Sequence, residues 1–183
     1  MLEVVAIIAV VLAIVIAVVL ILAARKPDVF SVQRAATMQA PPEKIFSLIN
    51  DFRRWGTWSP WEHRDPAMKR TFSGTERGKG AVYVWDGNRN VGSGQMEIVD
   101  AAAPSRIVIK LDFIKPFEGH NTAEFTMLPR GGATEVAQTQ VIWTMHGATP
   151  FLGKVMHLFI NMDKMIGNDF EAGLANLKKA VEQ

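Results

Sequence analysis

Cysteine is absent from this 183-residue chain, and so are most motifs that mark a chemical centre. Without cysteine there is no disulfide framework, thiol nucleophile or thiolate metal site. No histidine lies four residues from another, so the helical zinc-binding spacing is missing; the histidines are His63, His120, His146 and His157. A Gly-x-Ser-x-Gly elbow, a P-loop and a dinucleotide-binding glycine fingerprint are also missing. We therefore assign no catalytic residue, no metal site and no cofactor.

An excess of charge of one sign is also lacking. The chain has 20 basic and 18 acidic side chains, a formal net charge of +2. Lysine and arginine do not cluster among aromatic residues, so nucleic acid is not an expected partner. About half of the residues (49%) are apolar, which excludes a disordered chain. The length and the single long apolar run exclude a large multidomain enzyme and a multi-pass membrane protein.

Much of the apolar content lies in one segment, an unbroken run of Ala, Val, Ile and Leu from Val4 to Ala24. At about 1.5 Å per helical residue, this run spans the roughly 30 Å hydrocarbon core of a bilayer. The alternative is a cleaved secretory signal. That alternative fits less well because Met1-Leu2-Glu3 has no basic side chain, the run is too long, and residues 22–24 form a poor cleavage site. We predict a transmembrane anchor at residues 1–26 and one soluble domain at residues 27–183.

The charges beside the run indicate its orientation. Arg25 and Lys26 follow it directly, whereas Glu3 precedes it. The positive-inside rule then predicts a single-pass protein of the cell membrane with its C-terminal domain in the cytoplasm. Because a strand is expected at residues 29–34, directly after Pro27, the domain should lie close to the membrane surface.

The soluble part begins with that strand and continues with two short helical segments. Pro41, Pro42 and Glu43 form a helix-start signal, since proline is tolerated in the first turn and glutamate favours the N-terminal dipole. Residues 51–58 indicate a second short helix or turn. Apolar residues then alternate with polar ones along a series of segments, expected as strands at residues 68–73, 81–85, 94–99, 107–113, 123–127 and 139–145. Turn residues separate them at 86–90 and at 129–132. The alternation predicts an antiparallel sheet with one buried face.

The C-terminal segment has helical rather than strand periodicity. Apolar residues recur every three or four positions, at Val155, Phe159, Met162, Ile166, Phe170, Leu174, Leu177 and Val181. We expect one long amphipathic helix, in which Gly167 and Gly173 mark close packing on the sheet or a bend. The whole pattern predicts an α+β fold in which a curved antiparallel sheet wraps around the final helix, with a groove or cavity beside it.

Several strings, in this order, resemble the START-like superfamily of helix-grip folds (SRPBCC), and within it the polyketide cyclase/dehydrase group. The matching strings are APPEKIF (40–46), NDFRRW (50–55), WSPW (58–61), VGSG (91–94), TEV (134–136), WTM (143–145) and GLANLKK (173–179). The resemblance covers about residues 29 to 182. It implies a cavity for lipids, sterols or polyketide-like compounds. Members include ligand-binding proteins, aromatase/cyclases and co-chaperones, so the resemblance does not by itself imply an enzyme.

Aromatic and methionine side chains are the candidate lining of such a cavity. Aromatic walls with a polar edge are typical of apolar ligand sites, and methionines line adaptable ones. Ordinary core packing is the alternative, and it is expected for Trp143 in particular. The candidate ligand-binding residues are Trp58, Trp61, Trp85, Phe113, Phe125, Trp143, Phe159 and Met162.

Two further segments carry weaker signals. The mixed-charge run from Glu62 to Asp65 is expected to be a solvated loop, with His63 as a possible acid or base at a cavity mouth. Residues 151–160 are apolar on more than one side. The surplus side chains, Phe151, Leu152, Leu158 and Ile160, indicate a cavity lid or a patch that enters the bilayer beside the anchor.

Three functions remain open. The first, favoured by the missing catalytic motifs, is a membrane-anchored, non-catalytic binding protein for a lipid or other hydrophobic small molecule. The second is an enzyme of the polyketide cyclase/dehydrase type acting on a hydrophobic substrate. The third is a protein-interaction domain of the co-chaperone kind, whose cavity is small and collapsed.

Overall fold

The computed structural model describes residues 1–130 and 137–183, and it confirms the expected helix-grip architecture. The predicted turn at 129–132 lies partly outside the described residues, and the TEV string lies wholly outside them. Seven strands form one sheet: β1 (Val29–Met38), β2 (Lys69–Gly74), β3 (Ala81–Asp86), β4 (Ser93–Ala102), β5 (Arg106–Lys115), β6 (Gly119–Arg130) and β7 (Gln138–Ala148). The helices are α1 (Leu2–Ala24), α2 (Pro42–Ile49), the 3₁₀ helix η1 (Phe52–Thr57), α3 (Phe151–Met156) and α4 (Met162–Glu182).

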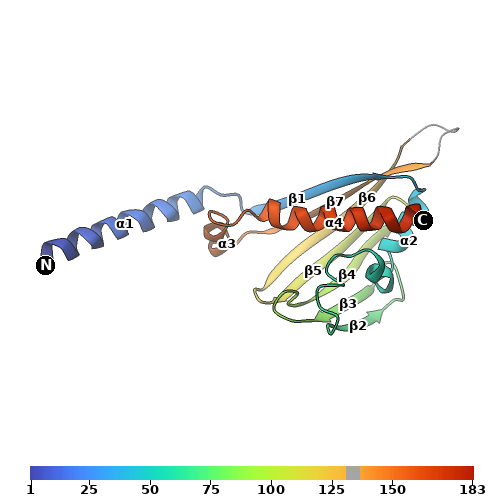
Figure 1. Cartoon of the computed structure of the whole chain (residues 1–183), viewed down its shortest axis with the longest axis horizontal. Coiled ribbons are helices and arrows are strands. Elements are labelled where there is room, and N and C mark those ends of the chain that lie inside the picture. Colours follow the sequence, from blue (N-terminus) through green and yellow to red (C-terminus); the bar gives the residue numbers. More distant parts are fainter. Residues whose placement is uncertain (131–136) are drawn as a thin grey trace.

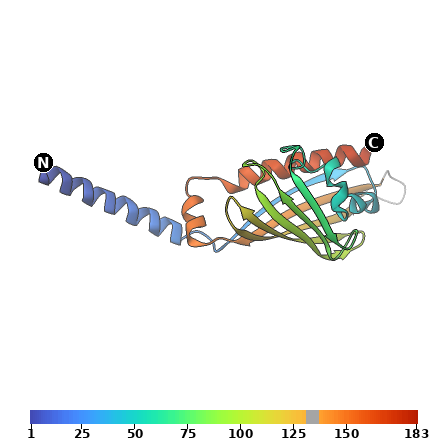
Figure 2. The same ribbon diagram turned by 90° about the horizontal axis from the view of Figure 1, so that it is seen from below.

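Every strand pairs antiparallel with its neighbours, in the order β1-β7-β6-β5-β4-β3-β2. The sheet therefore runs as a meander from β2 to β7, and the first strand of the domain closes it at the far edge. Figure 2 shows the sheet curving, with α4 along one side. α4 packs chiefly on β1, so the edge strand and the last helix form one side of the domain.

Alternation along the strands produces the buried face that the sequence predicts. In β3, Ala81, Tyr83 and Trp85 are buried, and the residues between them are half-buried. β7 repeats the pattern, with Val141 and Trp143 facing the core. Side chains of successive residues in a strand point to opposite faces, so these residues together form the inner face of the sheet.

The prediction of one continuous C-terminal helix is wrong. The structure divides the segment into α3 and α4, so Val155 and Phe159 do not belong to the same helix as Phe170. The Asn161 side chain accepts a hydrogen bond from the Lys164 N–H at 2.9 Å, which makes Asn161 the N-cap of α4. An N-cap residue has a non-helical backbone, so a helix starts there and does not continue through it. Residues 157–161 form the connection between the two helices.

Close packing, rather than a bend, accounts for the two glycines of α4. A Cβ atom at Gly173 would lie 2.8 Å from the ring of Trp143 and 3.2 Å from Pro60. At Gly167 it would collide with the guanidinium of Arg34, which forms ion pairs with Asp163 and Glu171. The glycines let α4 approach the sheet and the segment after η1.

α1 extends away from the domain as a separate helix (Figure 1). It has the length and apolar composition of a membrane span or of a signal sequence, and its side chains are exposed along almost all of its length. Its C-terminal end contacts α3, where Ala23 is buried. Lys154 of α3 bonds Asp28, just after α1, at 2.5 Å. α3 is thus fixed against the point where α1 joins the domain.

Candidate ligand-binding site

The inner face of the sheet holds a closely packed group of aromatic rings, which we call the aromatic cluster. Its members are Trp55, Trp58, Trp61, Phe125, Trp143 and Phe170. Trp143 stacks on Phe170 of α4 with ring centroids 4.0 Å apart and planes 7° apart. Phe125 covers the ring of Trp143 at 4.7 Å, and Trp58 meets it edge-on at 5.7 Å. The rings occupy the space between sheet and helix in which a cavity was expected.

Four of the eight candidate residues, Trp58, Trp61, Phe125 and Trp143, therefore lie together in this cluster. Two of them retain an unused polar group, because the indole N–H groups of Trp58 and Trp143 are buried without a hydrogen-bond acceptor among the described residues. Trp55 differs, since its indole N–H donates to the carbonyl of Ile49 at 2.9 Å. Buried donors are usually paired, so these two N–H groups depart from the usual pattern. A role for these four residues in ligand binding stays a prediction.

The other four candidates lie in two separate places. Trp85 and Phe113 form an edge-to-face pair at 5.8 Å on β3 and β5, away from α4. Phe159 and Met162 lie near the other edge of the sheet, where they line a pocket. The eight candidate residues therefore form three separate groups and do not line one common site.

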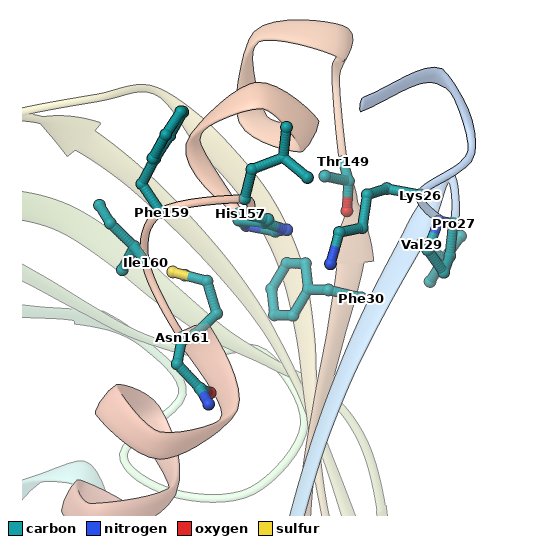
Figure 3. Close-up of a pocket in the computed structure, with 11 residues that line it drawn as sticks. Lys26, Pro27, Val29, Phe30, Thr149, His157, Phe159, Ile160 and Asn161 are labelled. Carbon is teal, nitrogen blue, oxygen red and sulfur yellow. The ribbon is translucent and has the colours of Figure 1, made fainter. Parts of the chain in front are cut away.

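The pocket with Phe159 and Met162 lies beside the C-terminal end of α1, and we call it the α1-end pocket (Figure 3). It has a volume of about 470 Å³, within the usual range for small-molecule sites. Three segments form it: the residues from the turn after α1 to the start of β1, Thr149 directly after β7, and the connection between α3 and α4. Its lining residues are Lys26, Pro27, Val29, Phe30, Thr149, His157, Leu158, Phe159, Ile160, Asn161 and Met162.

Apolar side chains form one part of this pocket and three polar groups another. Figure 3 shows the Lys26 ammonium and the Thr149 hydroxyl pointing toward the same space, next to the rings of Phe30 and His157. The imidazole of His157 packs edge-on against Phe30 at 6.3 Å. Burial, together with the positive charge of Lys26, lowers the pKa of His157. The imidazole is therefore neutral at pH 7, and it offers one donor and one acceptor.

Thr149 is the most informative of these residues. Its side chain is only 6% exposed, yet its hydroxyl has no hydrogen-bond partner among the described residues. A buried hydroxyl without a partner destabilises the fold by about 1–3 kcal/mol. An occupant of the pocket with a polar atom at this point would satisfy it.

We expect Thr149→Val to raise the free energy of unfolding of the ligand-free protein by about 1 kcal/mol, because valine has nearly the same shape and no hydroxyl. Thr139→Val is the matched control. The Thr139 hydroxyl is equally buried but donates to the carbonyl of Ala40 at 2.8 Å, so its loss should lower stability by about 1 kcal/mol. Urea unfolding of both variants followed by circular dichroism checks the opposite signs. Destabilisation by both would contradict an unpaired Thr149 hydroxyl.

The apolar surplus of residues 151–160 lies at the same end of the domain. Leu152 is 72% exposed and Phe159 is 75% exposed, and Phe151 and Ile160 are exposed as well. Leu158, by contrast, turns into the pocket and is half-buried. α3, which begins with Phe151 and Leu152, adjoins the end of α1 (Figure 1).

A second hollow, of about 540 Å³, lies at the opposite end of α4, and polar residues form most of those that line it. His63 lies there, exposed, beside Arg54 and Lys179. No hydroxyl or carboxylate pairs with His63 among the described residues, so its role as an acid or base stays a prediction.

The expectation of a solvated loop at residues 62–65 is wrong for its two carboxylates. Glu62 is only 10% exposed and accepts bonds from Arg70 at 2.7 Å and from the Tyr83 hydroxyl at 2.6 Å. Asp65 is buried and accepts from the backbone N–H groups of Ala67 and Asn88. Sequence patterning misses both because their partners come from β2, β3 and the turn after β3. The two carboxylates hold this loop against the sheet.

We expect alkaline unfolding to coincide with ionisation of Tyr83, the one tyrosine of the chain. Burial, and then the Glu62 carboxylate, raise the pKa of Tyr83 well above its usual range. The unfolded chain loses this proton near pH 10, and the folded chain does not. Stability that is complete below about pH 10 is therefore lost as pH rises further. Phenolate absorbance and circular dichroism should change together. Phenolate formation near pH 10 in a chain that is still folded would contradict this.

Glu62→Gln is the informative variant for the same titration. It removes the carboxylate charge beside Tyr83 but leaves the burial, which is the larger cause of the shift. The pKa of Tyr83 should fall relative to the unsubstituted chain and remain above its ordinary value. Arg70 also loses its ionic partner, so this variant should begin to unfold at a lower pH.

The family and structure comparisons agree with this fold. The family model described as polyketide cyclase/dehydrase and lipid transport matches residues 29–182. No curated protein matches the chain. A Thermobifida fusca protein is 21% identical, with a TM-score of 0.59 over 82% of this chain and 92% of that one. A START superfamily protein from Mycobacterium smegmatis is 17% identical, with a TM-score of 0.54 over 84% and 97%.

One similar structure has an enzymatic description. The di-domain aromatase/cyclase BexL of the BE-7585A biosynthetic pathway is 14% identical, with a TM-score of 0.58 over 88% of this chain and 53% of that one. At such identities the similarity extends to the fold alone, and the shared fold does not assign a reaction.

Proposed function

Because the chain belongs to the polyketide cyclase/dehydrase and lipid transport family, we propose that it is a membrane-anchored, non-catalytic binding protein for a lipid or other hydrophobic small molecule. The helix-grip domain holds this ligand in the α1-end pocket. The observation that carries the proposal is the position of the pocket. Two of its lining residues, Lys26 and Pro27, lie directly after the one helix, among the described residues, that is long and apolar enough to span a bilayer.

The lining of the pocket supports a hydrophobic ligand. Phe30, Leu158 and Met162 provide apolar contacts, and methionine adapts to ligands of different shape. The exposed side chains of Leu152 and Phe159 provide an apolar surface beside α1. In our proposal this surface enters the bilayer interface, so a lipid reaches the pocket without crossing water.

The proposed setting is the cytoplasmic face of the cell membrane. Arg25 and Lys26 directly follow α1, and positive charges next to a span favour the cytoplasmic side. Arg34 adds little to this bias because its guanidinium pairs with Asp163 and Glu171. Protease accessibility in sealed membrane vesicles tests the side on which the domain lies.

Native mass spectrometry of the full chain, released from membranes in a mild detergent, tests ligand binding directly. We expect a stoichiometric lipid or other apolar molecule on the unsubstituted protein, identified by extraction. Met162→Trp, which fills the pocket, should lose most of that ligand. Met165→Trp is the matched control, because Met165 lies on the same helix and is exposed outside the pocket.

The outcomes separate the alternatives. Equal ligand retention by both variants would place the ligand elsewhere in the domain. A protein free of ligand, which also takes up none from lipid vesicles, would contradict the binding function and favour the protein-interaction alternative. A bound compound that the protein converts to a product would favour the cyclase/dehydrase enzyme.

A further inference from the structure

We infer that the α1-end pocket selects amphiphiles with one anionic oxygen headgroup, a carboxylate or a phosphate, and an apolar tail. This inference rests on the proposed function and names the chemical class of its ligand. It follows from the polar groups at one side of the pocket, the charges around them, and the position of the apolar side chains.

Three side chains that bind anionic oxygens converge at the polar side. The ammonium of Lys26 donates hydrogen bonds and carries the positive charge, the hydroxyl of Thr149 is buried without a partner, and the imidazole of His157 can donate one ring N–H. Hydrogen bonds from a charged donor to an anionic oxygen are shorter and stronger than those between neutral groups. A neutral headgroup would satisfy the hydroxyl of Thr149 but would leave the charge of Lys26 unbalanced.

The carboxylates close to the pocket already have partners. Asp28 bonds Lys154 of α3 at 2.5 Å, and Asp163 bonds Arg34 at 3.0 Å. Among residues 1–130 and 137–183, Lys26 takes part in no ion pair. Lys26 is exposed, so its charge is solvated when no ligand is bound and remains available to an anionic ligand.

The start of α4 adds to this positive potential. Asn161 and Met162, its N-cap and first residue, line the pocket, so the N-terminal end of a 21-residue helix lies beside it. The aligned peptide dipoles of a helix place a partial positive charge at that end, which favours anions. The dipole by itself is a weak signal. Here it supplements the free cation and the buried unpaired hydroxyl.

The apolar side of the pocket gives the tail its direction. Phe159 and Ile160 line the side of the pocket opposite Lys26 (Figure 3), and both are exposed. A headgroup held by Lys26 and Thr149 therefore leaves an attached tail in contact with these two side chains. A free anion would use the polar side alone. This apolar wall is the reason to infer an amphiphile as the ligand.

The test compares two lipids that differ in one group. The full chain is placed in nanodiscs of phosphatidylcholine that contain equal amounts of phosphatidic acid and of diacylglycerol with the same tails. Native mass spectrometry then measures which lipid remains bound. We expect about tenfold more phosphatidic acid than diacylglycerol on the protein, the ratio expected when a charge-assisted hydrogen bond is present in only one complex.

Substitutions identify the residues that cause the preference for phosphatidic acid over diacylglycerol. Lys26→Gln should bring the ratio close to one, whereas Thr149→Val should lower the retention of both lipids because either headgroup can bond its hydroxyl. Arg25→Gln removes an equal charge from the neighbouring residue, which does not line the pocket, and should leave the ratio unchanged. If Arg25→Gln lowers the ratio as much as Lys26→Gln does, the preference is a general attraction to anionic surfaces and the inference is wrong.

Two results overturn the inference without affecting the proposed function, and a third also affects that function. Equal retention of the two lipids would show a hydrophobic site without headgroup selection. Displacement of phosphatidic acid by soluble glycerol phosphate at equal concentration would show a plain phosphate site. Retention of neither lipid, with no ligand on the protein isolated from cells, would count against the proposed function itself.

Discussion

Trp143→Ala is expected to lower the free energy of unfolding by about 3–5 kcal/mol, a large fraction of the stability of a domain of this size. Trp143 lies at the centre of the aromatic cluster. Its ring stacks on Phe170 and on Phe125 and also meets Trp58 and Trp61 edge-on. Removing the ring leaves a cavity. Its neighbours Phe125 on β6 and Phe170 on α4 cannot move far enough to fill it. Urea unfolding of the full chain in detergent, followed by far-ultraviolet circular dichroism, measures the loss.

Trp143→Phe is the control for ring stacking. It keeps an aromatic ring against Phe170 and removes the indole N–H, which has no acceptor in the part of the chain that the structure describes. We expect a loss well below that of Trp143→Ala, about 1–2 kcal/mol, because a smaller cavity is partly offset by removal of an unpaired buried donor. Equal losses for the two variants would mean that stacking on Phe170 contributes little to stability.

The second large effect concerns α1. Val11→Asp combined with Ile14→Asp should abolish stable insertion, since each charged residue at the centre of a span costs about 2.5–3.5 kcal/mol. Both residues are exposed on α1, outside the domain, so the substitutions leave the core unchanged. The measurement is the fraction of the chain that remains with membranes after an alkaline carbonate wash. Val11→Leu combined with Ile14→Leu is the matched control and should remain in the membrane fraction.

The mass of the mature chain distinguishes an anchor from a signal sequence. A retained anchor gives a membrane-bound protein that still contains residues 4–24. A soluble protein that begins after residue 24 would contradict the anchor, and with it the proposed delivery of ligand from the bilayer to the α1-end pocket.

The strands were predictable because local alternation is a direct consequence of strand geometry. Met96 and Ile98, for example, face the core, whereas the alternating residues Gln95 and Glu97 do not. The antiparallel order of β2 to β7 followed from the same pattern and from the turns between them, whereas the pairing of β1 with β7 did not. Gly173 was also predictable as a contact, because a glycine within a helix weakens it unless close packing requires the small residue.

The sequence pattern did not indicate the break before α4, because the connection between α3 and α4 is itself apolar. Phe159 continues the spacing of Val155 and Met162, so periodicity alone extends the helix through residues 157–161. The signal against this reading was Asn161, three residues before Lys164. Asparagine is a strong N-cap residue, and an N-cap inside an apolar pattern indicates a new helix start.

The α1-end pocket could not be derived from the sequence because its walls come from distant segments. Lys26 and Phe30 lie more than a hundred residues from Thr149 and His157, and only the pairing of β1 with β7 brings them together. The same holds for Glu62 with Tyr83, whose hydrogen bond depends on how the loop after η1 folds onto β3. Spacing along the chain contains no information on such contacts.

Photo-crosslinking of the full chain in bilayers tests the central claim most directly. The bilayer contains an anionic lipid with a photoactivatable group in its tail, and mass spectrometry of the peptides locates the adducts. The account predicts adducts on the connection between α3 and α4 and on the start of β1, with Phe30, Leu158 and Met162 as the expected sites. Adducts on the aromatic cluster at Trp58, Trp61 or Phe170, with none in the α1-end pocket, would contradict it.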